Sequence, residues 1–239
     1  MKGLDFKLEN VLFLDIETVP AAKTYADFSP AMVSLWNHKA EWIAPKEATP
    51  GEKYERAGIY AEFGRIVCIS VGYFSGMTPP VLRIKSFSGH QEAAILKEFA
   101  DLVGKYFSQE QSCLCAHNWK EFDFPYISRR MVINQIPLPE KLNLHGMKKW
   151  EVMHLDTMEL WRFGDYKNFT SLELLAEILN IPSPKGDITG KDVGRTYWEE
   201  NDLERIVNYC QKDVITIAQI MRRYRYEPLI PDESIVIIS

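Results

Sequence analysis

The spacing of apolar residues alternates along the chain between the patterns of strands and of helices. Short apolar or alternating runs, rich in β-branched residues and bounded by turn residues, predict strands. These runs occur at 11–20, 65–74, 81–86, 112–116 and 151–155. Apolar residues repeat with a helical period at 30–43, 90–106, 123–133, 157–163, 170–179 and 201–226. This order of elements predicts an α/β protein with one mixed, five-stranded sheet flanked by helices.

Several polar residues at the ends of these elements have ordinary structural explanations. Asp123 is placed to cap the helix at 123–133. Thr170 has the spacing of a capping box for the helix that follows it, and Asp156 is interpreted as the cap of the helix before that one. His117, at the end of the fourth strand, is interpreted as a structural residue. A functional role for any such residue therefore needs support from its neighbours.

Two stretches lie outside the regular pattern. Residues 20–63 connect the first two strands and contain four prolines. A connection of this length is usually functional or an insertion, so we expect a single domain spanning 1–239 with an insertion at 20–63. That insertion either covers a substrate or packs as a surface excursion. The tail at 228–239 ends in an apolar run, which predicts a strand docked on the same domain.

The first strand carries two acids on one face. Side chains alternate along a strand, so Asp15 and Glu17 point the same way as Val11 and Phe13. Their backbones lie roughly 7 Å apart. Two carboxylates beside an apolar strand need a cation, a proton or water, and a divalent metal ion keeps both charged. The alternative is a pair of acids that ends a strand at solvent.

A second group of candidate residues lies between the fourth strand and the next helix, in the run NWKEFD at 118–123. Functional side chains of α/β sheets gather at such strand ends, which makes Asp123 a candidate ligand as well as a candidate helix cap. Trp119 and Phe122 are aromatic residues that could stack on bases or pack in the core.

A third group lies on the last helix, where Tyr209 and Asp213 are four residues apart and therefore neighbours on one helical face. They flank the apolar stripe, so Asp213 lies at the edge of the buried face. An acid in that position is costly unless it is paired or bound to metal. A simple hydrogen bond between the tyrosine hydroxyl and the carboxylate is the alternative.

The three groups follow one another as DxE, NxxxFD and YxxxD: Asp15 through Glu17, Asn118 through Asp123, and Tyr209 through Asp213. In this order and on these elements they resemble the DEDD superfamily of 3′–5′ exonucleases, in its tyrosine branch. The resemblance spans residues 12–222. It is closest to stand-alone bacterial relatives of the proofreading domain of family-B DNA polymerases.

The resemblance implies an RNase H-like fold and phosphodiester hydrolysis with two divalent ions, Mg²⁺ or Mn²⁺. It assigns Asp15 to both ions, Glu17 and Asp213 to the ion that activates water, and Asp123 to the second ion. Tyr209 would orient the attacking water. Four residues of the same motifs are expected to bind the substrate: Thr18, Asn118, Trp119 and Phe122.

Composition limits the function classes. The 239 residues carry a formal charge of −5, which argues against a protein that coats nucleic acid through a broad basic surface. It allows an enzyme that holds one strand end. No apolar run approaches the roughly 18 residues of a membrane span, and the N-terminus lacks the pattern of a secretory signal. The four cysteines show no zinc or redox spacing, so we expect reduced thiols in a cytoplasmic protein.

Three functions stay open at this point. The first is a DNA 3′–5′ exonuclease that prefers single-stranded or frayed ends, and the second is a 3′–5′ exoribonuclease with the same metal chemistry. The third is an inactive nucleic-acid-binding module, against which the complete set of four acids and a tyrosine argues. The first two differ in how the site treats the 2′-hydroxyl.

Overall fold

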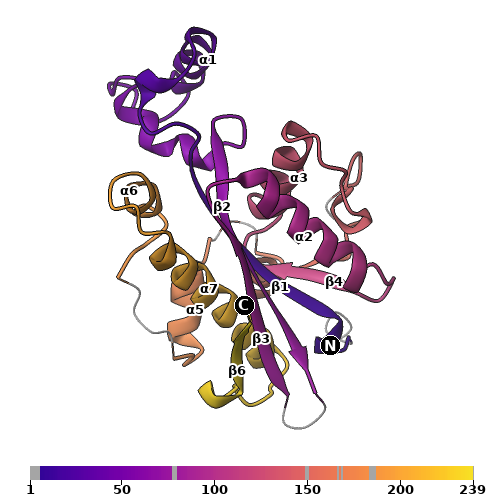
Figure 1. Cartoon of the computed structure of the whole chain (residues 1–239). Helices are drawn as coiled ribbons and strands as arrows, with labels where there is room; N and C mark the ends of the chain where they lie inside the picture. The colour runs from indigo at the N-terminus through magenta and orange to yellow at the C-terminus, as the bar shows by residue number, and fades with distance from the viewer. Residues whose placement is uncertain are drawn as a thin grey trace.

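One mixed sheet of six strands forms the centre of the computed structural model, which describes residues 6–76, 80–148, 151–165, 167, 169–182 and 187–238 (Figure 1). The strands are β1 (Val11–Pro20), β2 (Gly64–Ser75), β3 (Val81–Ser88), β4 (Cys113–Ala116), β5 (Leu155–Asp156) and β6 (Ile235–Ile238). Their order across the sheet is β5-β4-β1-β2-β3-β6. Because β1 pairs antiparallel with β2 and parallel with β4, the strand that carries the two acids lies inside the sheet.

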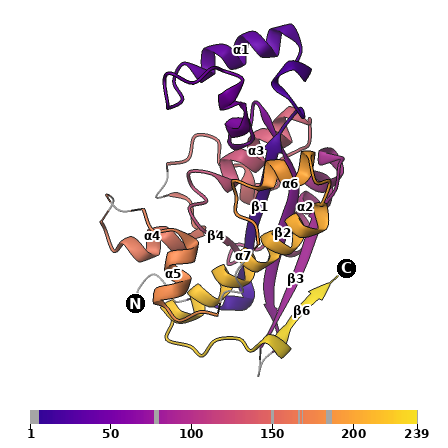
Figure 2. The same cartoon turned by 90° about the vertical axis from the view of Figure 1, so that its left-hand side faces the viewer.

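Helices cover both faces of the sheet, as the two views in Figures 1 and 2 show. α2 and α3 pack on one face, α6 and α7 pack on the other, and α5 packs against α7. The bounds are α1 (Pro30–Ala40), α2 (Glu92–Tyr106), α3 (Asp123–Ile133), α4 (Thr157–Arg162), α5 (Leu172–Ile178), α6 (Val193–Trp198) and α7 (Leu203–Tyr224). No helix within the described ranges has the length and apolar character needed to cross a membrane. The predicted α/β architecture with a mixed sheet is confirmed.

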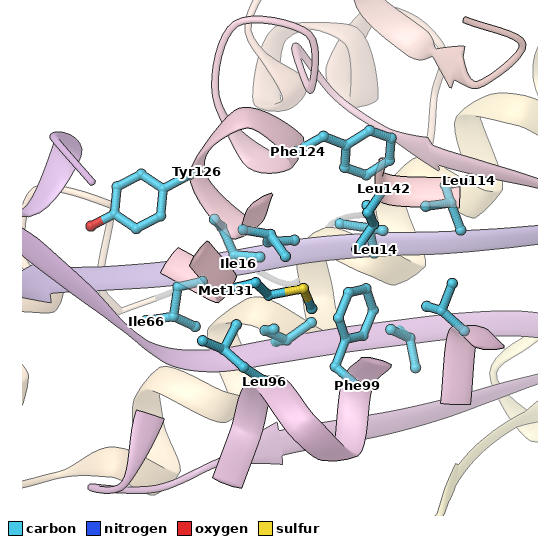
Figure 3. Close-up of a cluster of buried hydrophobic side chains, with 14 of the residues drawn as sticks. Leu14, Ile16, Ile66, Leu96, Phe99, Leu114, Phe124, Tyr126, Met131 and Leu142 are labelled. Carbon is cyan, nitrogen blue, oxygen red and sulfur yellow. The ribbon is translucent and has the colours of Figure 1, made fainter. Parts of the chain in front are cut away.

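The two faces of β1 separate as side-chain alternation predicts. Leu14 and Ile16 point into the larger core, which α2 and α3 complete (Figure 3). Phe13 points to the opposite face, where it packs with residues of α7. Asp15 and Glu17 continue the row of Phe13, so both acids face α7.

A β-bulge interrupts the pairing of β1 and β2 directly after the second acid. Glu17 pairs with Cys68 and Thr18 pairs with Ile66, so Val67 has no partner on β1. Val67 and Cys68 consequently both pack on the face of α6 and α7. Bulges bend a strand and re-aim its side chains, and this one places an extra residue of β2 beside the acids.

The sheet has one strand more than expected. The tail supplies it: β6 pairs parallel with β3, which confirms the predicted docking of the tail on its own domain. The fifth strand is shorter than predicted, because only Leu155 and Asp156 pair with β4. Just before them, the imidazole of His154 accepts the backbone N–H of Leu114 at 3.2 Å. This N–H of β4 is therefore not free to pair with the backbone of a longer β5.

Two helices differ from the expected boundaries. The cap of α5 is Ser171, whose hydroxyl accepts the N–H of Leu174 at 3.2 Å, and the capping box predicted from Thr170 is wrong by one residue. α6 begins in a stretch that the sequence pattern predicts to be loop. The helix has only 6 residues, too few for a helical period to be recognised. Its position depends on contacts with β1, among them the bond from the Trp198 indole N–H to the carbonyl of Pro20 at 3.1 Å.

The connection between β1 and β2 (residues 21–63) has a small core of its own and projects beyond the end of the sheet (Figure 1). Its buried members are Trp36, Ala40, Ile43, Tyr54, Ala57 and Phe63. The two ends of the connection are tied together, since the N–H of Ala21 donates to the carbonyl of Phe63 at 2.9 Å. The Tyr54 hydroxyl also bonds the backbone of Ala22. The connection is therefore an ordered substructure attached to the end of β1.

Candidate metal centre

Three potential metal ligands converge where β1 meets α7. The carboxylates of Asp15 and Glu17 and the thiol of Cys210 lie within 4.8 Å of one another. The acids share one face of β1, and Cys210 belongs to the buried stripe of α7 that packs against it. The thiol donates to the main-chain carbonyl of Asp15 at 3.4 Å. One of the contacts between α7 and the sheet is thus made at the acids themselves.

Tyr209 and Asp213 reach the same place from α7. Asp202 caps this helix by accepting the N–H of Arg205 at 3.1 Å, and the apolar stripe that follows fixes the rotation of the helix against the sheet. Tyr209 and Asp213 flank that stripe, and the Tyr209 hydroxyl donates to the Asp213 carboxylate. The charge of Asp213 acts on both Asp15 and Glu17, so the two groups predicted from separate parts of the sequence lie together.

Asp123 completes the cluster from the third side. Its side chain is only 3% exposed, and its carboxylate accepts the backbone N–H of Ile16, the residue between the two acids of β1. Phe122, not Asp123, occupies the N-cap position of α3, and Asp123 is the first residue of the helix. The predicted capping role of Asp123 is therefore wrong, because its carboxylate bonds its own backbone N–H and that of Ile16 and caps no later N–H of the helix.

Burial raises the pKa of every acid in the cluster, and repulsion by neighbouring carboxylates adds to this effect for Asp15, Glu17 and Asp123. Desolvation is the largest cause, and it acts with the charges of Asp213 and Asp123 to hold the pKa of Asp15 well above its ordinary value. The pKa of Glu17 rises likewise through burial and the charge of Asp15. Burial raises the pKa of Asp123 to about 7 and that of Asp213 to about 6, the latter opposed by the Tyr209 hydrogen bond. The same burial and charges raise the pKa of Tyr209.

The donor set of this cluster fits divalent cations. Within the described part of the chain, no lysine or arginine forms an ion pair with Asp15, Glu17, Asp123 or Asp213. Four carboxylates without a cationic partner must bind protons or metal ions. Oxygen-only ligands of this kind suit Mg²⁺ or Mn²⁺.

We expect the metal-free protein to lose thermal stability as the pH rises from about 4 to about 7. The pKa values of Asp123 and Asp213 are raised above the unfolded value, which is roughly 3.9. The folded state therefore binds more protons in this window, and its advantage disappears as the carboxyls ionise. Saturating Mg²⁺ at pH 8 should raise the Tm by about 5–10 °C, as expected for an ion present at roughly 100 times its Kd.

Calorimetric melting curves at pH 5 and pH 8, with and without Mg²⁺, test this expectation. Asp15→Asn supplies the control, because it removes one of the repelling charges and one ligand. The variant should melt at a higher temperature than the wild type at pH 8 without metal and should gain less from Mg²⁺. Equal Mg²⁺ shifts in both proteins would show that the acids do not share a site.

The four predicted substrate-binding residues have different surroundings. Thr18 lies at the bulge next to Glu17, is partly exposed, and its hydroxyl donates to that of Tyr126. Phe122 is partly exposed with its ring 5.4 Å from that of Tyr126. Asn118 has a left-handed backbone with φ 60° and turns the chain after β4. Thr18 and Phe122 directly neighbour the acids Glu17 and Asp123 in the chain, and all three positions stay in the proposed substrate site.

Trp119 is different, because its side chain is only 2% exposed. The indole packs in the core at 4.3 Å from the Phe124 ring and 5.7 Å from the His154 imidazole, measured between ring centres. A ring enclosed in this way offers no free face to a base. The burial argues against the substrate-binding role predicted for Trp119 and supports the alternative, core packing.

The structural interpretations of His117 and Asp156 are confirmed. The two nitrogens of the His117 ring bond the Thr157 hydroxyl and the Thr170 carbonyl, each at 2.9 Å. Asp156 caps α4 by accepting the N–H groups of Met158 and Glu159. It also accepts the N–H of Asn118 at 3.0 Å. Asp156 thereby fixes the turn that leads to Asp123. It supports the acid cluster without belonging to it.

Sequence reasoning did not include the two thiols at this site. Cys210 contacts Asp15, and Cys68 contacts Cys210 from β2, opposite Glu17. A signal for Cys210 was present, since it stands between Tyr209 and Asp213 in the apolar stripe and must face the strand on which α7 packs. For Cys68 there was none, because its place opposite Glu17 depends on the pairing register of β2 against β1, which periodicity does not give.

The chain is similar in sequence to a known protein family and to a DNA polymerase. The family model of the RNase_H superfamily matches residues 54–225, which is more than half of the chain and includes Asp123, Tyr209 and Asp213. A DNA polymerase of Archaeoglobus fulgidus is 27% identical over 147 residues, which cover 57% of this chain and 18% of the polymerase.

The structure of the family B DNA polymerase from the hyperthermophilic archaeon Pyrobaculum calidifontis superposes on 87% of this chain and 24% of the polymerase, with a TM-score of 0.52 and 19% sequence identity. The chain thus spans less than a quarter of either polymerase, and the likeness to the solved structure concerns the fold. Together with the mixed sheet and its flanking helices, the family match establishes an RNase H-like fold. The chain belongs to the RNase_H superfamily.

Proposed function

We propose that the chain is a metal-dependent 3′–5′ exonuclease that hydrolyses phosphodiester bonds at the 3′ end of DNA. The observation that carries the proposal is the convergence of four acids, with the Tyr209 hydroxyl bonded to one of them. Glu17 and Asp123 are buried, and Asp15 and Asp213 are partly buried. The folding free energy lost by burying these charges is recovered when the carboxylates bind protons or cations, and at neutral to alkaline pH cations are the effective partners. Such a cluster is a poor structural element and a suitable cradle for two divalent ions.

The chain's own residues divide the work by position. Asp15 lies within the influence of the charges of both Asp213 and Asp123, which supports the role that the family resemblance gives it, that of a residue that would hold both ions. Glu17 and Asp213 would hold one ion with it, and Asp123, on the α3 side, would hold the other. When bound, two such ions activate a water nucleophile and stabilise the leaving oxygen.

Tyr209 has a separate task in this scheme. Its raised pKa keeps the hydroxyl protonated, and that hydroxyl already donates to Asp213. A neutral phenol cannot replace a carboxylate as a ligand, but it can hold an attacking water by a hydrogen bond. We therefore assign Tyr209 to orienting that water.

The relatives favour DNA as the substrate, because both are DNA polymerases by name. Single-stranded or frayed ends suit the site better than intact duplex. The acids are recessed, with Glu17 6% and Asp123 3% exposed, so a separated strand reaches them more easily than a paired one. A chain with a formal charge of −5 also lacks the basic surface that would help it to open a duplex.

Incubation of end-labelled oligonucleotides with Mg²⁺ or Mn²⁺ tests the proposal. We expect a ladder of products that shorten one nucleotide at a time from the 3′ end, and no activity in EDTA. A 5′ block should change nothing, a 3′ block should stop the reaction, and single-stranded DNA should be degraded faster than a blunt duplex.

Two comparisons make this experiment decisive. A circular single strand has no 3′ end, so its cleavage at the rate of the linear strand would show an endonuclease. An RNA oligonucleotide of the same sequence separates the two exonuclease functions, and faster degradation of RNA than of DNA would identify an exoribonuclease.

A further inference from the structure

The thiol of Cys210 lies inside the acid cluster and has no task in the proposed hydrolysis. It is completely buried, and it lies within 4.8 Å of ligand oxygens of both Asp15 and Glu17. Its S–H donates to the Asp15 carbonyl at 3.4 Å, and a thiol is a weak donor. The group is therefore held at the metal centre by a bond that a metal ion can easily replace.

Glu17 indicates independently that this corner of the site binds a cation. Its side chain is 6% exposed, and in the described portion of the chain its carboxylate has no hydrogen-bond donor and no cationic partner. The charges that act on it most strongly belong to Asp15 and Asp213. A carboxylate in these surroundings is costly until a cation binds. The Cys210 thiol lies within 4.8 Å of this carboxylate and could bind the same cation.

A sulfur beside two carboxylates changes which ions the site prefers. Mg²⁺ takes oxygen ligands, whereas Zn²⁺ and Cd²⁺ combine thiolate with carboxylate. We propose that Asp15, Glu17 and Cys210 form a binding site for a thiophilic divalent ion, Zn²⁺ in the cell, that competes with Mg²⁺ or Mn²⁺ at the acids. The proposal rests on the cation-binding role of Asp15 and Glu17 in the proposed function, and it does not require hydrolysis.

Binding through the thiol has a defined proton balance. Without metal the sulfur carries its proton, since the S–H donates to the Asp15 carbonyl. On binding, the S–H bond breaks, a sulfur–zinc bond forms, and the proton passes to the buffer. Zn²⁺ binding therefore releases a proton from Cys210. Occupation by Zn²⁺ removes ligands from the Mg²⁺ site and inhibits the proposed hydrolysis.

Titration of the full chain with Cd²⁺ tests the site through a readout that is independent of activity. Cadmium bound to a thiolate shows an ultraviolet charge-transfer band, and we expect this band in the wild type. Cys210→Ser should lose the band and bind Cd²⁺ about 100-fold more weakly, at least the loss seen when a group supporting a metal ligand is removed. Its Mg²⁺ affinity, measured by calorimetry, should change far less, because Mg²⁺ makes no bond to sulfur.

Cys68→Ser is the matched control, because it removes the neighbouring thiol and leaves Cys210 in place. It should keep the band, and Zn²⁺ should displace Cd²⁺ from it. Cys210→Ala gives a second variant, and melting curves confirm that each variant is folded.

Either of two results overturns the proposal: no band in the wild type at saturating Cd²⁺, or a band that survives Cys210→Ser. Turnover of 3′-labelled DNA by the wild type with Mg²⁺ tests the proposed function separately. A chain that binds Cd²⁺ through Cys210 but leaves DNA intact would refute the hydrolysis alone.

Discussion

Asp213→Ala is expected to lower turnover on single-stranded DNA by at least about 10³-fold, since ligand loss forfeits several kcal/mol of metal-ion stabilisation of the transition state. The residue is a carboxylate near Asp15 and Glu17, and no other group among the described residues of α7 can replace its charge there. The variant should also bind Mn²⁺ more weakly by calorimetric titration. Both losses should appear together, because they have one cause.

Glu98→Ala is a suitable control, because it removes one carboxylate from the exposed face of α2, on the opposite side of the sheet. It should match the wild type in turnover and in Mn²⁺ affinity. Should Asp213→Ala keep full Mn²⁺ affinity while losing turnover, Asp213 would have to act as a proton-transfer group and the ligand assignment would fail.

Tyr209→Phe should separate positioning from metal binding on the same helix. The ring that packs beside Cys210 is kept, and only the hydroxyl that donates to Asp213 is lost. We expect normal Mn²⁺ affinity and a loss of turnover of about 10²-fold, the lower end for a positioned proton-transfer group. Removal of the hydroxyl donor should also raise the pKa of Asp213 further, since that hydrogen bond opposes the effect of burial.

Parallel turnover and Mn²⁺ titrations of Tyr209→Phe and Asp213→Ala provide the measurement. The pH dependence of the melting temperature without metal adds a second readout, because the ionisation of Asp213 in the metal-free protein should move to higher pH in Tyr209→Phe. Full activity in Tyr209→Phe would make Tyr209 a packing residue, and the tyrosine-branch resemblance would lose its defining position.

Alternation along β1 and helical spacing on α7 were sufficient to predict which candidate residues share a face of their own element. Asp15 and Glu17 lie on the Phe13 side of the strand, and Tyr209 and Asp213 flank one stripe of the helix. Both arguments are local, because they depend only on side-chain period. The packing of α7 on that face of β1 followed from the resemblance and not from periodicity.

What the sequence did not predict depends on contacts between distant segments. The burial of Trp119 is decided by Phe124 and His154, and His154 lies in a segment whose strand proved shorter than its pattern. The position of Cys68 depends on the register in which β2 pairs with β1, a feature that no periodicity marks. Short elements such as α6 and β5 carry too few residues for a period to be recognised.

The aromatic core of the connection at 21–63 has a consequence for how the chain folds. β1 and β2 are partners in the sheet, yet a long segment separates them, and the entropy cost of closing a loop grows by about 0.6 kcal/mol with each doubling of its length. A connection that condenses first, through Trp36 and Tyr54, brings its ends together at Ala21 and Phe63. The two strands then meet as though joined by a short turn. We therefore expect the acids of β1 to be set in register early and the residues of α7 to join them later, so that the site assembles in two stages.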